Sequence, residues 1–218
     1  FTMQIGDFLV KNNVKMIVIA CNTVSATCLE DLRKAYPDIP IIGVISPTAK
    51  VVAKECEDED HIGIIATKVT IKTNAYEKKV HEKRQGLQLF SKACPAFVPL
   101  IEEGIIKNDI MDLTIKYYLD DFIKANKINT LVLGCTHYPL IGENLRRIYP
   151  GLKIISSSKE VATAVKIELE KRDMFAEETQ LKNVFYASDL SENFVNMIQN
   201  ILGKEEDELN IKFKNLDI

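Results

Sequence analysis

The sequence predicts an α/β protein with two pseudo-symmetric domains, built from mainly parallel sheets flanked by helices, with a cleft between the domains. Two observations lead to this prediction. Short apolar runs alternate with amphipathic helical patterns along the chain, which is typical of βαβ units and a parallel sheet. In addition, one strand–cysteine–helix segment occurs twice, around Cys21 and around Cys135, which indicates an internal duplication.

The first copy begins with a helical pattern and continues through two apolar strands. Apolar residues at helical spacing alternate with short β-rich runs, so we expect helices over 1–13, 23–36 and 47–55 and strands over 15–20 and 40–45. An acidic turn follows at residues 55–60. The two copies stay in step, because Cys21 leads to Tyr36-Pro37 and Cys135 leads to Tyr149-Pro150.

The second series starts with the apolar run of residues 61–66, which predicts a buried strand. The patterns that follow predict a helix to about residue 81, a strand near 87–90, helices near 98–107 and 109–125, the strand 130–134, a strand after Tyr149-Pro150, a helix over 158–172, a strand over 184–187 and a helix to about 202. Residues 204–218 are charged with scattered apolar positions and give no assignment. We predict that residues 1–46 and 157–218 form the first domain and that residues 47–156 form the second.

The two copies differ in what precedes them. Thr67 lies 68 positions before Cys135, whereas only 20 residues precede Cys21. If the copies are comparable, the first domain lacks an N-terminal βα segment of roughly 50 residues. We therefore expect an N-terminally truncated chain.

Composition narrows the classes of function. The chain has 218 residues, 46% apolar content and a net charge of −3, with both signs of charge mixed. Without a basic patch, nucleic acid and membrane surfaces are poor partners, and a small-molecule substrate fits better. Residues 1–7 lack the layout of a signal peptide, so we expect a cytoplasmic protein with reduced thiols; none of the five cysteines forms a Cys-x-x-Cys pair.

Both repeated cysteines stand where open α/β sheets bind ligands, at the carboxyl end of a strand and just before a helix. The unpaired amides of a helix N-terminus favour a thiolate there. Two matched thiols that face each other across a cleft suit few reactions, and racemisation by two bases heads that list. Neighbouring donors could hold a substrate with more than one carboxylate; they are Asn22, Thr23, Thr67, Thr70, Thr136 and His137. We expect neither a cofactor nor a metal, because no Gly-rich phosphate loop and no pyridoxal-lysine context occurs.

At three segments the chain resembles bacterial glutamate racemases: Ala20-Cys21-Asn22-Thr23, Phe97 to Gly104 (FVPLIEEG) and Gly134 to Leu140 (GCTHYPL). The resemblance covers essentially the whole chain. It implies interconversion of L- and D-glutamate for peptidoglycan synthesis, with an active site in the cleft. It also implies a catalytic set of Cys21, Cys135, His137 and Glu102 and a substrate-binding set of Asn22, Thr23, Thr67, Thr70 and Thr136. The family's N-terminal Asp-Ser-Gly segment has no counterpart here, and Ala187-Ser188-Asp189 departs from its usual Ser-Gly-Asp order.

Two alternatives stay open. An aspartate racemase or related isomerase would share both thiols, but it usually has an acidic residue at the position of His137. A non-catalytic amino-acid-binding protein could keep the cleft, although it would not need two cysteines in register. A lone cysteine after a strand is usually a small buried residue, so the pair in register carries the argument, and Cys28, Cys56 and Cys94 have no duplicate. For assembly we expect a homodimer.

Overall fold

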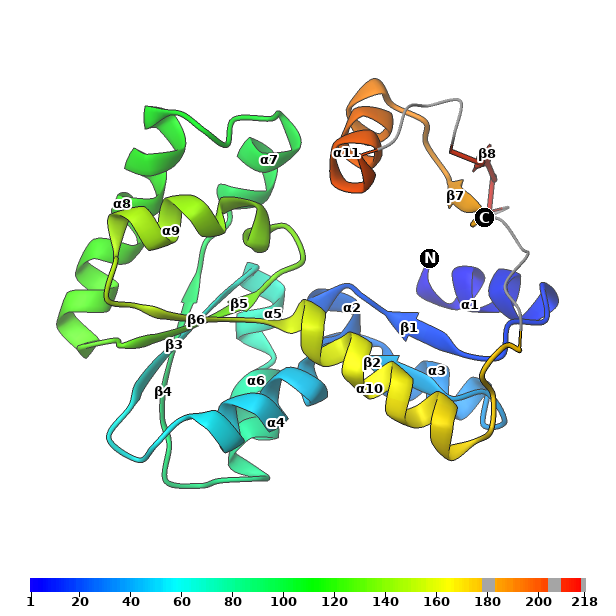
Figure 1. Cartoon of the computed structure of the whole chain (residues 1–218), viewed down its shortest axis with the longest axis horizontal. Helices are drawn as coiled ribbons and strands as arrows, with labels where there is room; N and C mark the ends of the chain where they lie inside the picture. The colour runs from blue at the N-terminus through cyan, green and yellow to red at the C-terminus, as the bar shows by residue number, and fades with distance from the viewer. Residues whose placement is uncertain (178–182, 204–208, 217–218) are drawn as a thin grey trace.

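The computed structural model describes residues 1–177, 183–203 and 209–216 (Figure 1). All strand pairs in these residues are parallel. They form three sheets: β1 (Ile17–Ile19) with β2 (Ile41–Gly43); β4 (Gln88–Ala93), β3 (His61–Ala66), β5 (Thr130–Gly134) and β6 (Lys153–Ser156) in that order; and β7 (Phe185–Ala187) with β8 (Ile211–Phe213). The predicted α/β class with mainly parallel sheets is confirmed.

Helices cover both faces of the four-stranded sheet (Figure 1). Because side chains alternate along a strand, Leu131 and Leu133 join one core while Val132 joins the other. The central strands β3 and β5 are therefore buried on both sides, as their unbroken apolar runs require. The first core is formed with α7 (Phe97–Glu102), α8 (Asp109–Asn126), the 3₁₀ turn η1 (Tyr138–Ile141) and α9 (Gly142–Ile148), and the second with α4 (Ile45–Glu55), α5 (Lys68–Lys72) and α6 (Ala75–His81).

The two-stranded sheet β1–β2 has a smaller core. Ile17 and Ile19 of β1 pack with Leu32 and Ile41, whereas Val18 between them is 41% exposed. The helices of this half are α1 (Thr2–Lys11), α2 (Asn22–Thr27), α3 (Leu29–Ala35) and, after β6, α10 (Ser157–Lys171); α11 (Glu192–Leu202) lies between β7 and β8 in the sequence. Figure 1 shows α10 running from the larger sheet to the smaller one, and it packs against both α4 and β2.

The duplication is visible in matching side-chain contacts. Tyr36 donates to Asp7 of α1 at 2.5 Å, and Tyr149 donates to Asp120 of α8 at 2.6 Å. Tyr36 ends α3 and Tyr149 ends α9, in each case the second helical segment after the repeated cysteine, and both aspartates lie on the helix before the cysteine's strand. The same bond thus ties the two helices around each repeated strand.

Several predicted elements have different bounds. The predicted helix 23–36 is interrupted at Cys28, whose φ of −125° leaves the helical range, and the helix to residue 81 is broken at Asn74, which has a φ of +52°. The predicted strand 40–45 ends at residue 43, because α4 already begins at Ile45. The predicted helix 98–107 ends at Glu102, two residues before Gly104 with a φ of +72°. The strand expected near 87–90 extends to residue 93.

The stretch left without assignment, 204–218, contains β8; residues 204–208 and 217–218 lie outside the described residues. The predicted domain borders at 46/47 and 156/157 fall at the start of α4 and immediately before α10. They stay predictions. In the part of the chain that the structure describes, every helix is too short or too polar to cross a bilayer.

Gly134 holds the end of β5 against its neighbours. A Cβ on Gly134 would lie 2.9 Å from the backbone oxygen of Ile65 and 3.1 Å from a ring carbon of Tyr76. Because a strand backbone cannot give way easily, we expect Gly134→Ala to lower the free energy of unfolding by about 1–3 kcal/mol. Gly151→Ala is the matched control, since no atom lies within 4 Å of its Cβ. Thermal unfolding would measure both, and equal melting temperatures would contradict this packing.

Candidate active site

The two repeated cysteines end equivalent strands. Cys21 follows β1, is exposed and caps the N-terminus of α2, whereas Cys135 follows β5 and is only 7% exposed. Burial raises the pKa of Cys135, the backbone N–H groups of His137, Thr136 and Tyr138 counteract this, and a negative charge on Cys21 raises it further. The two thiols therefore lie within electrostatic reach of each other, although 114 positions separate them in the sequence.

His137 links Cys135 to a carboxylate. Its Nδ1 lies 3.9 Å from Sγ of Cys135, and its Nε2 lies 3.0 Å from Oε1 of Glu102 on α7. A carboxylate only accepts hydrogen bonds, so it places the ring proton on Nε2 and leaves Nδ1 free to accept a proton from the thiol. Glu102 is half-exposed, and water weakens the ion pair that it could form with a protonated ring. Its effect is mainly to orient the ring.

Three threonine hydroxyls form a triangle beside Cys21. Oγ1 of Thr23 lies 2.9 Å from that of Thr67 and 3.2 Å from that of Thr70, and the last two are 3.1 Å apart. Thr67 caps α5, and its hydroxyl oxygen accepts a hydrogen bond from the backbone N–H of Thr70 at 3.4 Å. The contact with Thr23 joins α2 to α5, which lie side by side between the two halves in Figure 1. Each hydroxyl has one proton to donate, so a bound anion would accept protons that the hydroxyls otherwise share within the triangle.

Asn22 is buried next to Cys21 and is held by a residue that sequence analysis did not select. The hydroxyl of Tyr76 donates to Oδ1 of Asn22 at 2.6 Å. Tyr76 reads as an ordinary apolar position of an amphipathic helix, and its partner is 54 positions away, so no local signal marks this pair. The structure thus adds one functional candidate to the predicted set.

The remaining predicted residue, Thr136, is exposed directly after Cys135. The structure accordingly brings the nine predicted site residues into two groups: Cys21 with Asn22 and the threonine triangle, and Cys135 with Thr136, His137 and Glu102. Of the three cysteines without a duplicate, Cys56 and Cys94 are buried and Cys28 is half-buried.

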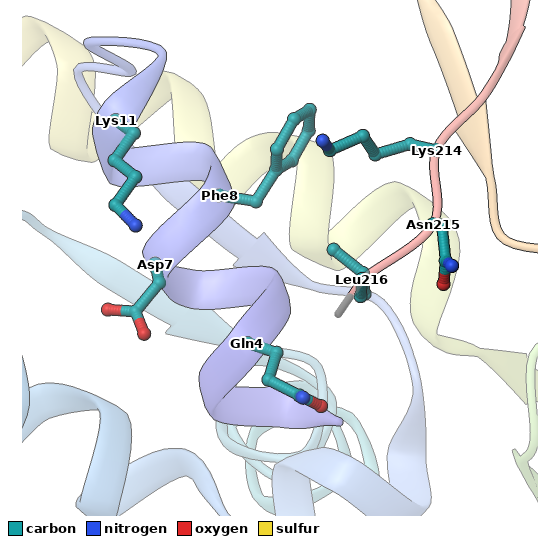
Figure 2. A pocket seen from close by; sticks show the side chains of 7 residues that line it. All are labelled: Gln4, Asp7, Phe8, Lys11, Lys214, Asn215 and Leu216. Carbon is teal, nitrogen blue, oxygen red and sulfur yellow. The ribbon is translucent and has the colours of Figure 1, made fainter. Parts of the chain in front are cut away.

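A surface pocket lies elsewhere, between α1 and the residues after β8 (Figure 2). Nζ of Lys214 stands over the ring of Phe8, 5.9 Å from its centre. None of the predicted site residues lines this pocket. We therefore assign it no part in the chemistry of the cysteines.

The different burial of the two thiols predicts an order of alkylation. We expect iodoacetamide near neutral pH to modify Cys21 well before Cys135, because Cys21 is exposed and Cys135 is buried with a raised pKa. The rate of alkylation at Cys135 should keep rising above pH 9, the ordinary pKa of a cysteine thiol, because the raised pKa of Cys135 means that its thiolate forms only at higher pH. Peptide mass spectrometry measures both rates, and Cys21→Ser is the control for the fast site. Equal rates at the two cysteines would contradict the geometry.

Comparison with known proteins agrees with this arrangement. The family model for Asp/Glu/Hydantoin racemase matches residues 4–165. The chain is 38% identical to the glutamate racemase of Aquifex aeolicus over 205 residues, which cover 94% of this chain and 76% of that protein. It is 42% identical to the glutamate racemase of a Sulfurihydrogenibium species over 186 residues, 85% of this chain and 69% of that one.

Comparison with solved structures also identifies glutamate racemases as similar proteins. The glutamate racemase RacE1 of Bacillus anthracis superposes with a TM-score of 0.91 at 31% identity, over 99% of this chain and 79% of that chain. The Francisella tularensis glutamate racemase, solved in complex with D-glutamate, gives a TM-score of 0.89 at 31% identity, over 98% of this chain and 78% of that chain. The fold is thus the two-domain α/β fold of racemases. The chain belongs to the Asp/Glu/Hydantoin racemase family of isomerases and, within it, to the glutamate racemases.

Proposed function

We propose that this chain interconverts L-glutamate and D-glutamate without a cofactor, by proton transfer between the α-carbon and two cysteines. The observation that carries the proposal is that Cys21 and Cys135 each follow an equivalent strand of the duplicated fold, and a negative charge on Cys21 raises the pKa of Cys135. The relatives named above are glutamate racemases, and one of them binds D-glutamate, which supports the choice of substrate.

In the proposed reaction one cysteine acts as a thiolate and the other as a thiol. The thiolate removes the α-proton from one face of the substrate, and the thiol delivers its own proton to the opposite face. The roles exchange with the handedness of the substrate. Burial of Cys135 and the negative charge of Cys21 both disfavour two simultaneous thiolates, so the working form carries one negative charge on the pair. The proton acceptor Nδ1 of His137 beside Cys135 supports this exchange of protons.

Hydroxyl and amide donors hold the substrate in this proposal. The triangle of Thr23, Thr67 and Thr70 and the amide of Asn22 flank Cys21, and Thr136 is exposed next to Cys135. Donors on both sides fit a substrate with two carboxylates, one at the α-carbon and one at the end of the side chain. We place this site in the cleft between a domain of residues 1–46 and 157–218 and a domain of residues 47–156.

The role in the cell that we propose is the supply of D-glutamate for peptidoglycan synthesis, by a cytoplasmic homodimer. The support for this part is the similarity to glutamate racemases. The runner-up reaction, racemisation of aspartate, has less support. His137 with its carboxylate partner occupies a position where aspartate racemases usually have an acidic residue.

Circular dichroism of the substrate tests the proposal. We expect the signal of L-glutamate and that of D-glutamate to decay to zero in the presence of the protein, whereas that of L-aspartate should stay nearly constant. Faster decay with aspartate would favour the runner-up. A stable signal with both amino acids, together with measurable binding of glutamate by calorimetry, would instead indicate a binding protein without turnover.

A further inference from the structure

Tyr76 contacts both cysteine segments at once. Its side chain is 1% exposed, and its hydroxyl donates to Oδ1 of Asn22, the residue after Cys21. Its ring packs against Gly134, the residue before Cys135, where an added Cβ would lie 3.1 Å from a ring carbon. Cys135 also contributes to the electrostatic environment of the phenol. One aromatic side chain from α6 therefore joins the two halves of the candidate site.

Only one of the two polar atoms of the Asn22 side-chain amide has a hydrogen-bond partner. Asn22 is 2% exposed, and Oδ1 accepts the bond from Tyr76, whereas Nδ2 has no partner. Among the described residues it is the single buried side-chain nitrogen or oxygen without one. A buried donor without an acceptor is costly, and such groups call for a functional explanation. Its position beside Cys21 offers one, because a substrate carboxylate would be the missing acceptor.

Tyr76 determines which end of the amide faces the substrate. Burial raises the pKa of Tyr76 above its ordinary value of about 10, so the hydroxyl keeps its proton at neutral pH and can donate. In the structure this hydroxyl donates to the carbonyl oxygen of the Asn22 amide, which leaves Nδ2 as the other end of the group. If the amide were reversed, its oxygen would take the place of Nδ2 and would repel a carboxylate instead of binding it.

We propose that Tyr76 is a positioning residue that locks the side-chain amide of Asn22 with Nδ2 available to a carboxylate of the substrate. The identity of that substrate rests on the proposed function. The lock itself is a property of the ligand-free protein, so the two can be tested separately.

The kinetic test removes only the hydroxyl. We expect Tyr76→Phe to raise the KM for glutamate roughly 5- to 30-fold, the loss of one hydrogen bond at the site, while kcat changes by less than about threefold. Tyr149→Phe is the matched control, because its hydroxyl also donates to a side-chain oxygen at 2.6 Å, and the acceptor, Asp120, is not one of the predicted site residues. An unchanged KM for Tyr76→Phe, or an equal rise in the control, would overturn the proposal.

A double-mutant cycle separates positioning from a general packing effect. If Tyr76 acts through Asn22, adding Tyr76→Phe to Asn22→Ala should change KM by less than about twofold. If the effects of Tyr76→Phe and Asn22→Ala on KM were additive, Tyr76 would not act through Asn22, which would contradict the proposed positioning role. Asn22→Asp keeps an acceptor for Tyr76 but replaces the donor with oxygen, so it should bind glutamate more weakly than Asn22→Ala does. The reverse order would overturn the proposed orientation even if Tyr76→Phe failed to fold.

Side-chain amide NMR of the ligand-free protein makes the test independent of turnover. The resonances of the Asn22 amide group can be identified by their loss in Asn22→Ala. We expect them to shift or broaden in Tyr76→Phe and to stay in place in Tyr149→Phe. This result in a protein that fails to racemise glutamate would support the lock and reject the proposed function. Unchanged Asn22 resonances in Tyr76→Phe would reject the lock whatever the activity.

Discussion

Cys21→Ser and Cys135→Ser are each expected to abolish racemisation of glutamate in both directions. The α-proton is weakly acidic, and a serine hydroxyl is far too weak an acid to supply the base or to replace the thiol as a proton donor. Each variant still retains one thiol on one side of the substrate. In deuterated water, residual exchange of the α-proton should then be confined to one enantiomer, and the complementary variant should prefer the other.

Cys28→Ser is the matched control for both variants. Cys28 lies between α2 and α3, is half-buried and has no duplicate in the second half. It should racemise glutamate at nearly the rate of the unmodified chain. Proton NMR in deuterated water measures the exchange, and circular dichroism measures racemisation. Near-normal racemisation by either single variant, or the same preferred enantiomer in both, would contradict a reaction shared by two thiols.

His137→Asn is expected to cause the second large loss of racemase activity. Nδ1 of His137 is the proton acceptor next to Sγ of Cys135, and general acid–base groups contribute about 10²–10⁴-fold to rates. We therefore expect kcat/KM to fall about 100-fold or more. Because the equilibrium constant of a racemisation is one, the fall must be the same in both directions. Assays from L- and from D-glutamate check this result, and a loss below about threefold would remove His137 from the mechanism.

Glu102 is expected to affect kcat/KM by orienting the ring of His137. Glu102→Gln removes the charge that keeps the ring proton on Nε2, so we expect a smaller loss, about tenfold in kcat/KM, and little further loss when it is combined with His137→Asn. Glu103→Gln is the control, since Glu103 is also an exposed carboxylate and lies one position further along the chain. Full additivity of the Glu102 and His137 variants would contradict an orienting role.

The sequence predicted what depends on local pattern. Unbroken apolar runs predicted β3 and β5, and the repeated strand–cysteine–helix segment placed Cys21 and Cys135 after equivalent strands. Each of these segments is encoded by a few neighbouring residues, so hydrophobic periodicity and a search for internal repeats suffice to find it.

What escaped prediction depends on tertiary contacts. The hydroxyl of Thr23 meets that of Thr67 across 44 positions, and Tyr76 meets Asn22 across 54, so neither pair has a local signature. The break at Cys28 was missed for a similar reason, because Cys28 continues an apolar helical pattern and only its backbone angles in the packed structure end the helix there. Asn74 is polar, and its left-handed backbone is typical of asparagine, so that break has a local signal.

The most direct test of the two-thiol account is the fate of the α-proton during the first turnovers in deuterated water. L-glutamate is given to the unmodified chain, and the D- and L-enantiomers are separated and analysed by mass spectrometry before equilibrium is approached. If one thiol removes the proton and the other delivers a solvent-derived one, the D-glutamate formed should carry deuterium at the α-carbon while the remaining L-glutamate keeps its protium. D-glutamate that retains the original proton, or L-glutamate that gains deuterium as fast as product forms, would indicate a single base and contradict the account.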